Sequence, residues 1–147
     1  MISLNEAREL AEKTLSKKRF QHTLNVEEMA VKLADKNGVD PNKAALAALL
    51  HDIAKEMAPE TQLQILKGND IISNYAALRE QAIWHGGAAA VLAQRDYGVD
   101  DAEILSAIAN HTTGKPGMTK LDKIIYMADM VSAESTYPQA VFLRRKV

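Results

Sequence analysis

The feature that most constrains the fold is a run of alanine and leucine, Ala44–Leu50, followed directly by His51 and Asp52. Alanine and leucine are among the best helix formers, and Asp40 supplies an N-cap in front of a first-turn proline. The run is apolar on every side, so we expect the central buried helix of the protein over about Pro41–Glu56. A histidine and an aspartate are thereby expected beside the core.

The rest of the sequence predicts further helices and no sheet. Alternating runs of β-branched residues bounded by turn residues are hard to find, whereas capping residues are frequent. Ser3 with Glu6 and Thr119 with Asp122 have capping-box spacing, and Asp100 is expected to cap a further helix. We therefore expect an all-α protein in which the other helices cover about residues 4–17, 19–37, 59–68, 75–83, 85–97, 101–111 and 120–129.

Composition excludes several classes of protein. The 147 residues contain no cysteine, which rules out disulfide scaffolds, thiolate zinc sites and cysteine nucleophiles. Eighteen basic and nineteen acidic residues leave a net charge of −1, so no electrostatic attraction to nucleic acid is indicated. No apolar stretch is long enough to span a bilayer, and no signal peptide is apparent. We expect a cytoplasmic protein with no nucleic-acid and no membrane partner.

The four histidines and two of the aspartates form the most informative set. The helix pattern places each histidine at or beside an apolar helix face, and Asp129 lies within an apolar helix segment. Burying an unpaired carboxylate is costly, and one divalent cation would convert carboxylates and neutral imidazoles into paired ligands. The alternative is a buried polar network in which both aspartates only hydrogen bond to histidines. The candidate residues are His22, His51, Asp52, His85, His111 and Asp129.

The order of these residues resembles the HD-domain metal-dependent phosphohydrolases, and five blocks resemble the bacterial YqeK family. The blocks are RFQHTLNV (19–26), LLHDIAKE (49–56), WHGGAAA (84–90), NHTTG (110–114) and MTKLDKIIYMAD (118–129). Members of that family are symmetrical diadenosine tetraphosphate hydrolases that bind iron. The resemblance implies a single compact HD-domain helical bundle of about six to eight helices over residues 1–147, with its core at about 19–134.

The resemblance also implies a reaction and a ligand set. The implied reaction is hydrolysis of a dinucleoside polyphosphate, with diadenosine tetraphosphate cleaved to two ADP by a metal-bound hydroxide. Iron, as one or two ions, is the implied metal, and manganese and magnesium are the alternatives. A first metal would be held by His22, His51, Asp52 and Asp129, and Asp52 would bridge to a second metal held by His85 and His111.

Several residues near these ligands are candidates for contact with phosphate. Lys55 follows Asp52 by three residues and lies on the same helix face if that helix continues, so both are candidate catalytic residues. Arg19 lies three residues before His22 and is a candidate substrate contact. The polar loop after the last histidine suits a polyphosphate chain, although it is also an ordinary connection. Its residues are Thr112, Thr113, Gly114 and Lys115.

Other interpretations fit the same residues. An HD phosphohydrolase acting on a nucleoside monophosphate or a cyclic dinucleotide would need the same metal cage. A non-catalytic nucleotide- or metal-binding module would be a second alternative. Gly86 and Gly87 either permit close backbone approach beside His85 or simply begin a helix. A homodimer is left open. The tail at 135–147 is expected to be a solvated end, and to be either truncated or divergent relative to the family.

Overall fold

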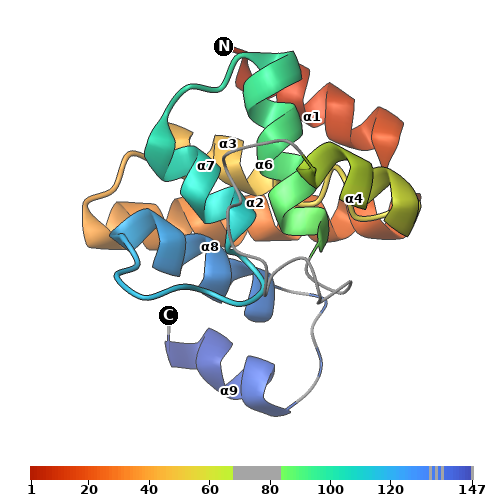
Figure 1. Ribbon diagram of the computed structural model, residues 1–147. Helices are drawn as coiled ribbons and strands as arrows, with labels where there is room; N and C mark the ends of the chain where they lie inside the picture. The colour runs from red at the N-terminus through yellow and green to blue at the C-terminus, as the bar shows by residue number, and fades with distance from the viewer. Residues whose placement is uncertain (68–83, 133, 135, 137, 147) are drawn as a thin grey trace.

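The computed structural model describes residues 1–67, 84–132, 134, 136 and 138–146, and these residues form eight helices and no strand (Figure 1). The expected all-α fold is confirmed. The helix expected over 75–83 lies outside the described residues. No helix among the described residues has the length and apolar character needed to cross a membrane. The helices are α1 (Leu4–Thr14), α2 (Lys17–Asn37), α3 (Pro41–Leu50), α4 (Pro59–Leu66), α6 (Trp84–Tyr97), α7 (Ala102–Ala109), α8 (Lys120–Met130) and α9 (Pro138–Lys146).

Helix α3 lies at the centre of the bundle. Every residue of Ala44–Leu50 is buried, and helices α1, α2, α6, α7 and α8 all pack against α3. The side chain of Asp40 accepts a hydrogen bond from the amide of Asn42 at 2.9 Å and caps the helix as predicted. An all-apolar helix therefore forms the centre of the core, and the residues that follow it begin inside the protein.

The predicted end of this helix is wrong. Helix α3 ends at Leu50, and the chain continues through turns in which the amide of Lys55 donates to Asp52 O at 2.9 Å. The imidazole Nδ1 of His51 donates to Ala48 O at 2.6 Å, an acceptor that a continuing helix would use for the next amide. The side chain of His51 thus competes with the helix and turns the chain at the point where the site begins.

Local capping signals determine several other helix boundaries. Both expected capping boxes are present, and Gly38 ends α2 with a φ of 69°, a left-handed conformation that favours glycine. The N-cap of α7, however, is Asp101 and not Asp100 as predicted. Asp101 accepts hydrogen bonds from two amides of the first turn and also pairs with Lys43 Nζ at 2.9 Å. The ion pair with Lys43 on α3 therefore explains why Asp101, and not the adjacent Asp100, is the N-cap of α7.

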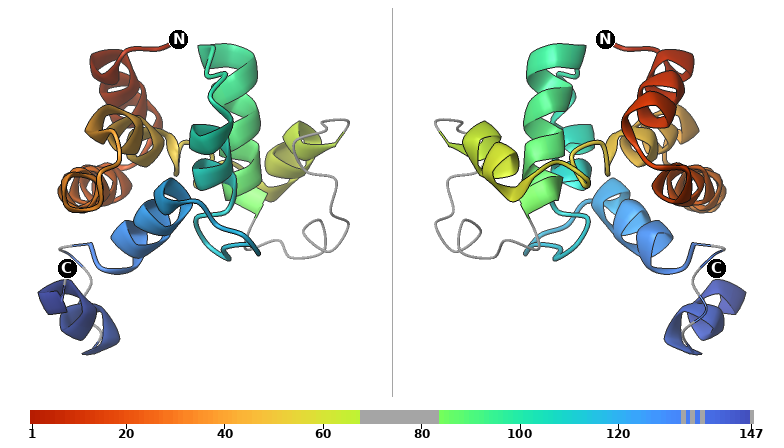
Figure 2. Two further views of the ribbon diagram at one scale, coloured as in Figure 1. Left: turned by 90° about the vertical axis from the view of Figure 1, so that its left-hand side faces the viewer. Right: turned by 90° about the vertical axis from the view of Figure 1, so that its right-hand side faces the viewer.

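Most described residues of the C-terminal tail are exposed, as the sequence suggested, but the tail also forms a helix that is attached to the rest of the protein. Residues 138–146 form α9, in which Ala140 is fully buried. Arg144 donates from Nε to Val131 O and from Nη2 to Ser132 O, both at 2.8 Å. Figure 2 shows α9 beyond the end of α8, on the side away from α1. Through Arg144, this helix fixes the backbone that leaves α8.

Candidate metal centre

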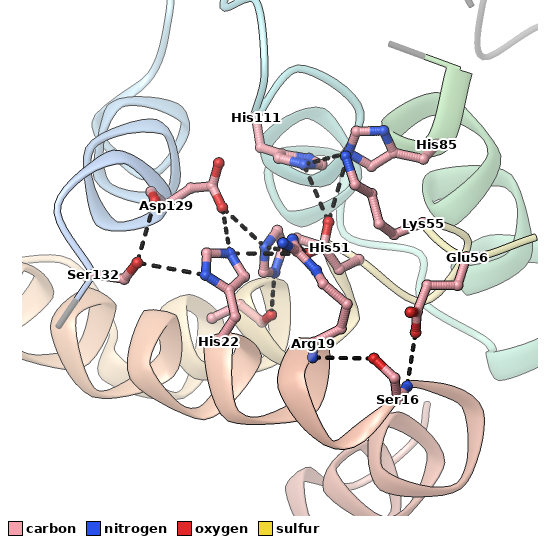
Figure 3. Close-up of polar contacts among 12 residues, drawn as sticks. Ser16, Arg19, His22, His51, Lys55, Glu56, His85, His111, Asp129 and Ser132 are labelled. Atoms are coloured by element: carbon pink, nitrogen blue, oxygen red, sulfur yellow. Dashed lines mark hydrogen bonds and ion pairs between the residues drawn. The ribbon is translucent and has the colours of Figure 1, made fainter. Parts of the chain in front are cut away.

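The six residues predicted as ligands come from five separate parts of the fold and meet in one cluster (Figure 3). Helix α2 contributes a histidine from its first half, and the turn after α3 contributes the adjacent histidine and aspartate. A further histidine lies at the start of α6, another follows α7, and the second aspartate lies near the end of α8. These residues are His22, His51, Asp52, His85, His111 and Asp129.

One half of the cluster gathers around Asp129. Its Oδ1 lies 2.8 Å from His22 Nε2 and 3.3 Å from His51 Nε2. On the opposite side, Asp52 Oδ2 lies 3.4 Å from His51 Nε2 and 3.8 Å from His22 Nε2. Ligand atoms about 2.1 Å from one cation are roughly 3–3.5 Å from one another, so these spacings match a shared ion.

The other half gathers around the second oxygen of Asp52. Asp52 Oδ1 lies 3.5 Å from His85 Nε2 and 3.6 Å from His111 Nε2, and the two imidazole nitrogens are 3.1 Å apart. Asp52 is 1% exposed and therefore presents one carboxylate oxygen to each half of the cluster. A carboxylate has lone pairs on both oxygens and can serve two cations, which a single imidazole nitrogen cannot do.

Two of the histidines are oriented by the backbone. Nδ1 of His51 donates to Ala48 O at 2.6 Å, and Nδ1 of His111 donates to Ile108 O at 2.8 Å. A neutral imidazole that donates from Nδ1 has its free lone pair on Nε2, and in both residues Nε2 is the atom that faces the cluster. This is the usual arrangement of a histidine that ligates a metal.

Two buried atoms in the cluster have no hydrogen-bond partner among the described residues, namely His51 Nε2 and Asp52 Oδ1. Leaving a buried polar atom unpaired costs about 1–3 kcal/mol, and more when the group is charged. A hydrogen-bonded polar network would satisfy these atoms, whereas here they point to the middle of the cluster. Imidazole nitrogen and carboxylate oxygen also form a donor set that suits a divalent transition metal.

The electrostatics of the cluster favour charged aspartates. Burial raises the pKa of Asp52 and of Asp129, but the adjacent imidazoles outweigh this effect and hold both pKa values well below their usual range. Burial alone would lower the pKa of His51, yet the carboxylates of Asp52 and Asp129 raise it to about 9. One buried and one partly buried anion therefore require positive charge close by, which a protonated His51 supplies unless a bound cation takes the place of its Nε2 proton.

In the half of the cluster near α6, the pKa of a histidine is lowered and not raised. Burial lowers the pKa of His85 to about 4, and the neighbouring His111 and Lys55 act in the same direction. His85 is accordingly a neutral imidazole at physiological pH, which is the form that binds a metal. Figure 3 shows the Lys55 side chain extending from the turn after α3 toward His85 and His111.

The candidate substrate residues are placed less uniformly than the ligands. Arg19 forms an ion pair with Asp52 Oδ2, and 28% of its side chain is exposed. Lys55 is exposed and lies on a turn, so the continuing helix assumed in its prediction is absent. Figure 3 nevertheless shows both side chains beside the cluster. These two cations adjoin the candidate metal centre from different elements.

The loop after α7 begins at the cluster and leads away from it. The hydroxyl of Thr112 is buried and has no hydrogen-bond partner among the described residues, and Thr113 donates to Gly114 O at 3.2 Å. Lys115 Nζ lies 4.0 Å from Asp122 Oδ2, at the start of α8. Within the described part of the chain, no hydrogen bond or ion pair joins Thr113, Gly114 or Lys115 to the six cluster residues.

Three polar residues around His22 were missed from the sequence, namely Glu134, Ser132 and Asn25. Glu134 Oε1 accepts a hydrogen bond from His22 Nδ1, and Ser132 Oγ donates to the same oxygen at 2.8 Å. Asn25 Nδ2 donates to Glu134 Oε2 at 2.7 Å. The available signal was weak, since it consisted of one acidic residue five positions after Asp129, in a segment without helical periodicity.

Known proteins resemble this chain in both sequence and fold. The HD domain family model matches residues 19–134. The chain is 38% identical over 137 residues to the symmetrical bis(5'-nucleosyl)-tetraphosphatase of Bacillus subtilis, covering 93% of this chain and 73% of that protein. It is also 38% identical over 141 residues to the protein of the same name from Staphylococcus aureus, covering 93% of this chain and 70% of that one.

A crystal structure has the same architecture. It is that of a predicted HD superfamily hydrolase involved in NAD metabolism from Clostridium acetobutylicum, with a TM-score of 0.91 and 34% sequence identity. The superposition covers 99% of this chain and 77% of that one. Together with the matches to these two relatives, this similarity shows that the chain belongs to the HD-domain family of hydrolases, in the group of the bacterial symmetrical bis(5'-nucleosyl)-tetraphosphatases.

Proposed function

We propose that this protein hydrolyses dinucleoside tetraphosphates and cleaves diadenosine tetraphosphate symmetrically into two molecules of ADP. The observation that carries the proposal is the buried cluster of four histidines and two aspartates, in a chain whose relatives at 38% identity are named for this reaction. A mononucleotide or a cyclic dinucleotide as substrate, and binding without turnover, are outcomes that the experiment below separates.

The cluster is proposed to hold one or two divalent cations, with iron as the metal and manganese or magnesium as substitutes. The unpaired atoms of His51 and Asp52 and the neutral state of His85 support this assignment. A cation held by these residues would lower the pKa of a bound water molecule and would neutralise charge on phosphate oxygens. The first ion is assigned to His22, His51, Asp52 and Asp129, and the second to Asp52, His85 and His111.

The protein's own residues then have distinct tasks. Asp52 joins the two halves of the site, because each of its oxygens faces a different pair of histidines. Lys55 extends toward the same centre, and its ammonium stabilises negative charge that develops on a phosphate. Arg19 has five N–H donors in its guanidinium, so its contact with Asp52 leaves others for a phosphate oxygen.

The loop at 112–115 is proposed to contact the remaining phosphates of the substrate. It begins directly after His111, and the buried hydroxyl of Thr112 is available as a donor at the end next to the cluster. The backbone amides of Thr113 and Gly114 are the further candidates, and Lys115 supplies charge once it leaves Asp122. The cytoplasmic location and the homodimer stay predictions.

Product analysis tests the proposal. Purified protein loaded with Fe²⁺ without oxygen, or with Mn²⁺, is incubated with diadenosine tetraphosphate, and the products are separated by chromatography. ADP as the only nucleotide product is expected. AMP together with ATP would reject symmetrical cleavage, and turnover restricted to a mononucleotide or a cyclic dinucleotide would reject the substrate class. Asp35→Ala, at an exposed position of α2, is the control for Asp52→Ala.

A further inference from the structure

We infer that Glu134 is the residue that positions His22 as a metal ligand, by fixing the tautomer and the orientation of its imidazole. This inference rests on the proposed metal centre and adds a residue outside the predicted ligand set. Glu134 lies in the segment between α8 and α9, and its carboxylate approaches the ring of His22 from the side opposite Asp129.

The position of His22 in its helix explains why a separate acceptor is needed. His51 and His111 follow helix ends, where the carbonyl three residues earlier is free to accept from Nδ1. His22 is the sixth residue of the 21-residue helix α2, where the preceding carbonyls accept the amides of the following turn. The backbone therefore offers no acceptor for Nδ1 of His22, and a side chain has to supply one.

Glu134 supplies that acceptor. Its Oε1 contacts His22 Nδ1, while Nε2 of the same ring lies 2.8 Å from Asp129 Oδ1. A neutral imidazole has a single N–H, so donation from Nδ1 to Glu134 leaves the lone pair of Nε2 facing the cluster. A carboxylate in this role also increases the basicity of the imidazole and hence its strength as a ligand.

The carboxylate of Glu134 is itself held in place. Asn25, three residues after His22 on α2, donates from Nδ2 to Oε2 at 2.7 Å. Ser132, which is fully buried, donates from Oγ to Oε1 at 2.8 Å. Both oxygens are thus engaged by neutral donors, which hold the carboxylate in the orientation that faces His22.

This arrangement assigns Glu134 a positioning role and not that of a ligand. The two ring nitrogens of His22 point in different directions, and only Nε2 points to Asp129 and Asp52. The cluster side of the ring is occupied by those aspartates, whereas Glu134 is on the outer side, with 39% of its side-chain surface exposed. Removing its carboxylate should change metal affinity without unfolding the protein.

The test is a titration of the full chain with Mn²⁺, followed by electron paramagnetic resonance of the free ion. We expect Glu134→Ala to weaken Mn²⁺ binding by about 10- to 100-fold, the usual effect of losing the partner that orients a ligand. Glu134→Gln keeps an oxygen acceptor and should recover most of the affinity, which a merely structural role would not predict. Glu28→Gln removes a charge from an exposed position of α2 and should have no effect.

A second readout reports on the ring itself. In ¹⁵N-labelled protein loaded with Zn²⁺, long-range ¹H–¹⁵N correlations of His22 should show a proton on Nδ1 and none on Nε2. Unchanged Mn²⁺ affinity in Glu134→Ala, or an unprotonated Nδ1 in the wild type, would overturn the inference about Glu134. Neither result would contradict the proposed metal centre. Failure of the wild type to bind Mn²⁺ would instead reject the metal centre, and the inference with it.

Discussion

Gly86 is the position at which a single methyl group should disturb the site most selectively. It lies at the third residue of α6, where that helix passes the end of α7. A Cβ atom there would lie 2.9 Å from Ala109 O, 3.2 Å from Ile108 O and 3.4 Å from His111 Cε1. Carbon and oxygen atoms approach to about 3.3 Å, so Gly86→Ala requires the two helices to separate by roughly 0.4 Å.

Two opposing contributions determine how Gly86→Ala changes the free energy of unfolding. Replacing glycine by alanine in a helix is normally worth up to about 1 kcal/mol of stability. Overpacking against backbone atoms, which cannot rotate away, costs about 1–3 kcal/mol. We therefore expect Gly86→Ala to lower the free energy of unfolding by up to about 2 kcal/mol, or the melting temperature by up to about 8 °C.

The same movement should weaken metal binding. Ile108 O accepts the hydrogen bond from His111 Nδ1, so displacing this carbonyl turns the imidazole away from Asp52. The assay is urea unfolding of metal-free protein combined with Mn²⁺ titration. The pair Gln94→Ala and Gln94→Gly, at an exposed position of α6, measures the alanine–glycine difference without a clash. A Gly86→Ala protein that is more stable than the wild type, with unchanged Mn²⁺ affinity, would refute the reasoning.

Three further predictions follow from other parts of the molecule. Asp52→Ala should abolish Mn²⁺ binding and hydrolysis together, and full activity of that variant without metal would contradict the mechanism. Burial raises the pKa of Asp101, but the hydrogen bond from Lys43 and those from backbone amides lower it overall. Asp101→Asn should therefore cost about 0.5–1 kcal/mol at pH 7. Because the folded pKa lies below the unfolded value of about 3.9, this cost should shrink as the pH falls below 4, as urea unfolding at pH 7 and pH 3 can verify. Arg144→Ala should weaken Mn²⁺ binding in a calorimetric titration, because Arg144 holds the carbonyl of Ser132 next to Glu134, and unchanged affinity would show that α9 has no influence on the site.

The parts of the fold that the sequence predicted are those with local physical causes. The Ala44–Leu50 run is buried because no face of such a helix can be solvated at low cost, and a capping box at Ser3 requires only residues three apart. The candidate ligand cluster could be anticipated because carboxylates beside several imidazoles at apolar helix faces require compensation wherever the helices lie. The structure adds that the two oxygens of Asp52 face different histidines, Oδ2 facing His51 and Oδ1 facing His85.

The features that the sequence did not predict depend on contacts between distant segments. Helix α3 ends early because the imidazole of His51 takes a backbone acceptor, a competition that helix propensity does not include. Asp101 prevails over its neighbour as the N-cap through an ion pair with Lys43, 58 positions earlier in the chain. Glu134 and Arg144 lie in a segment whose composition resembles a tail, and only the folded chain brings them to α2 and α8.

The most direct test of the central claim is the anomalous scattering from crystals of the protein grown with Mn²⁺. The account predicts strong density peaks inside the cluster, one bounded by His22, His51, Asp52 and Asp129, and a second bounded by Asp52, His85 and His111. Peaks only at surface carboxylates, combined with hydrolysis of diadenosine tetraphosphate that continues in excess chelator, would contradict it.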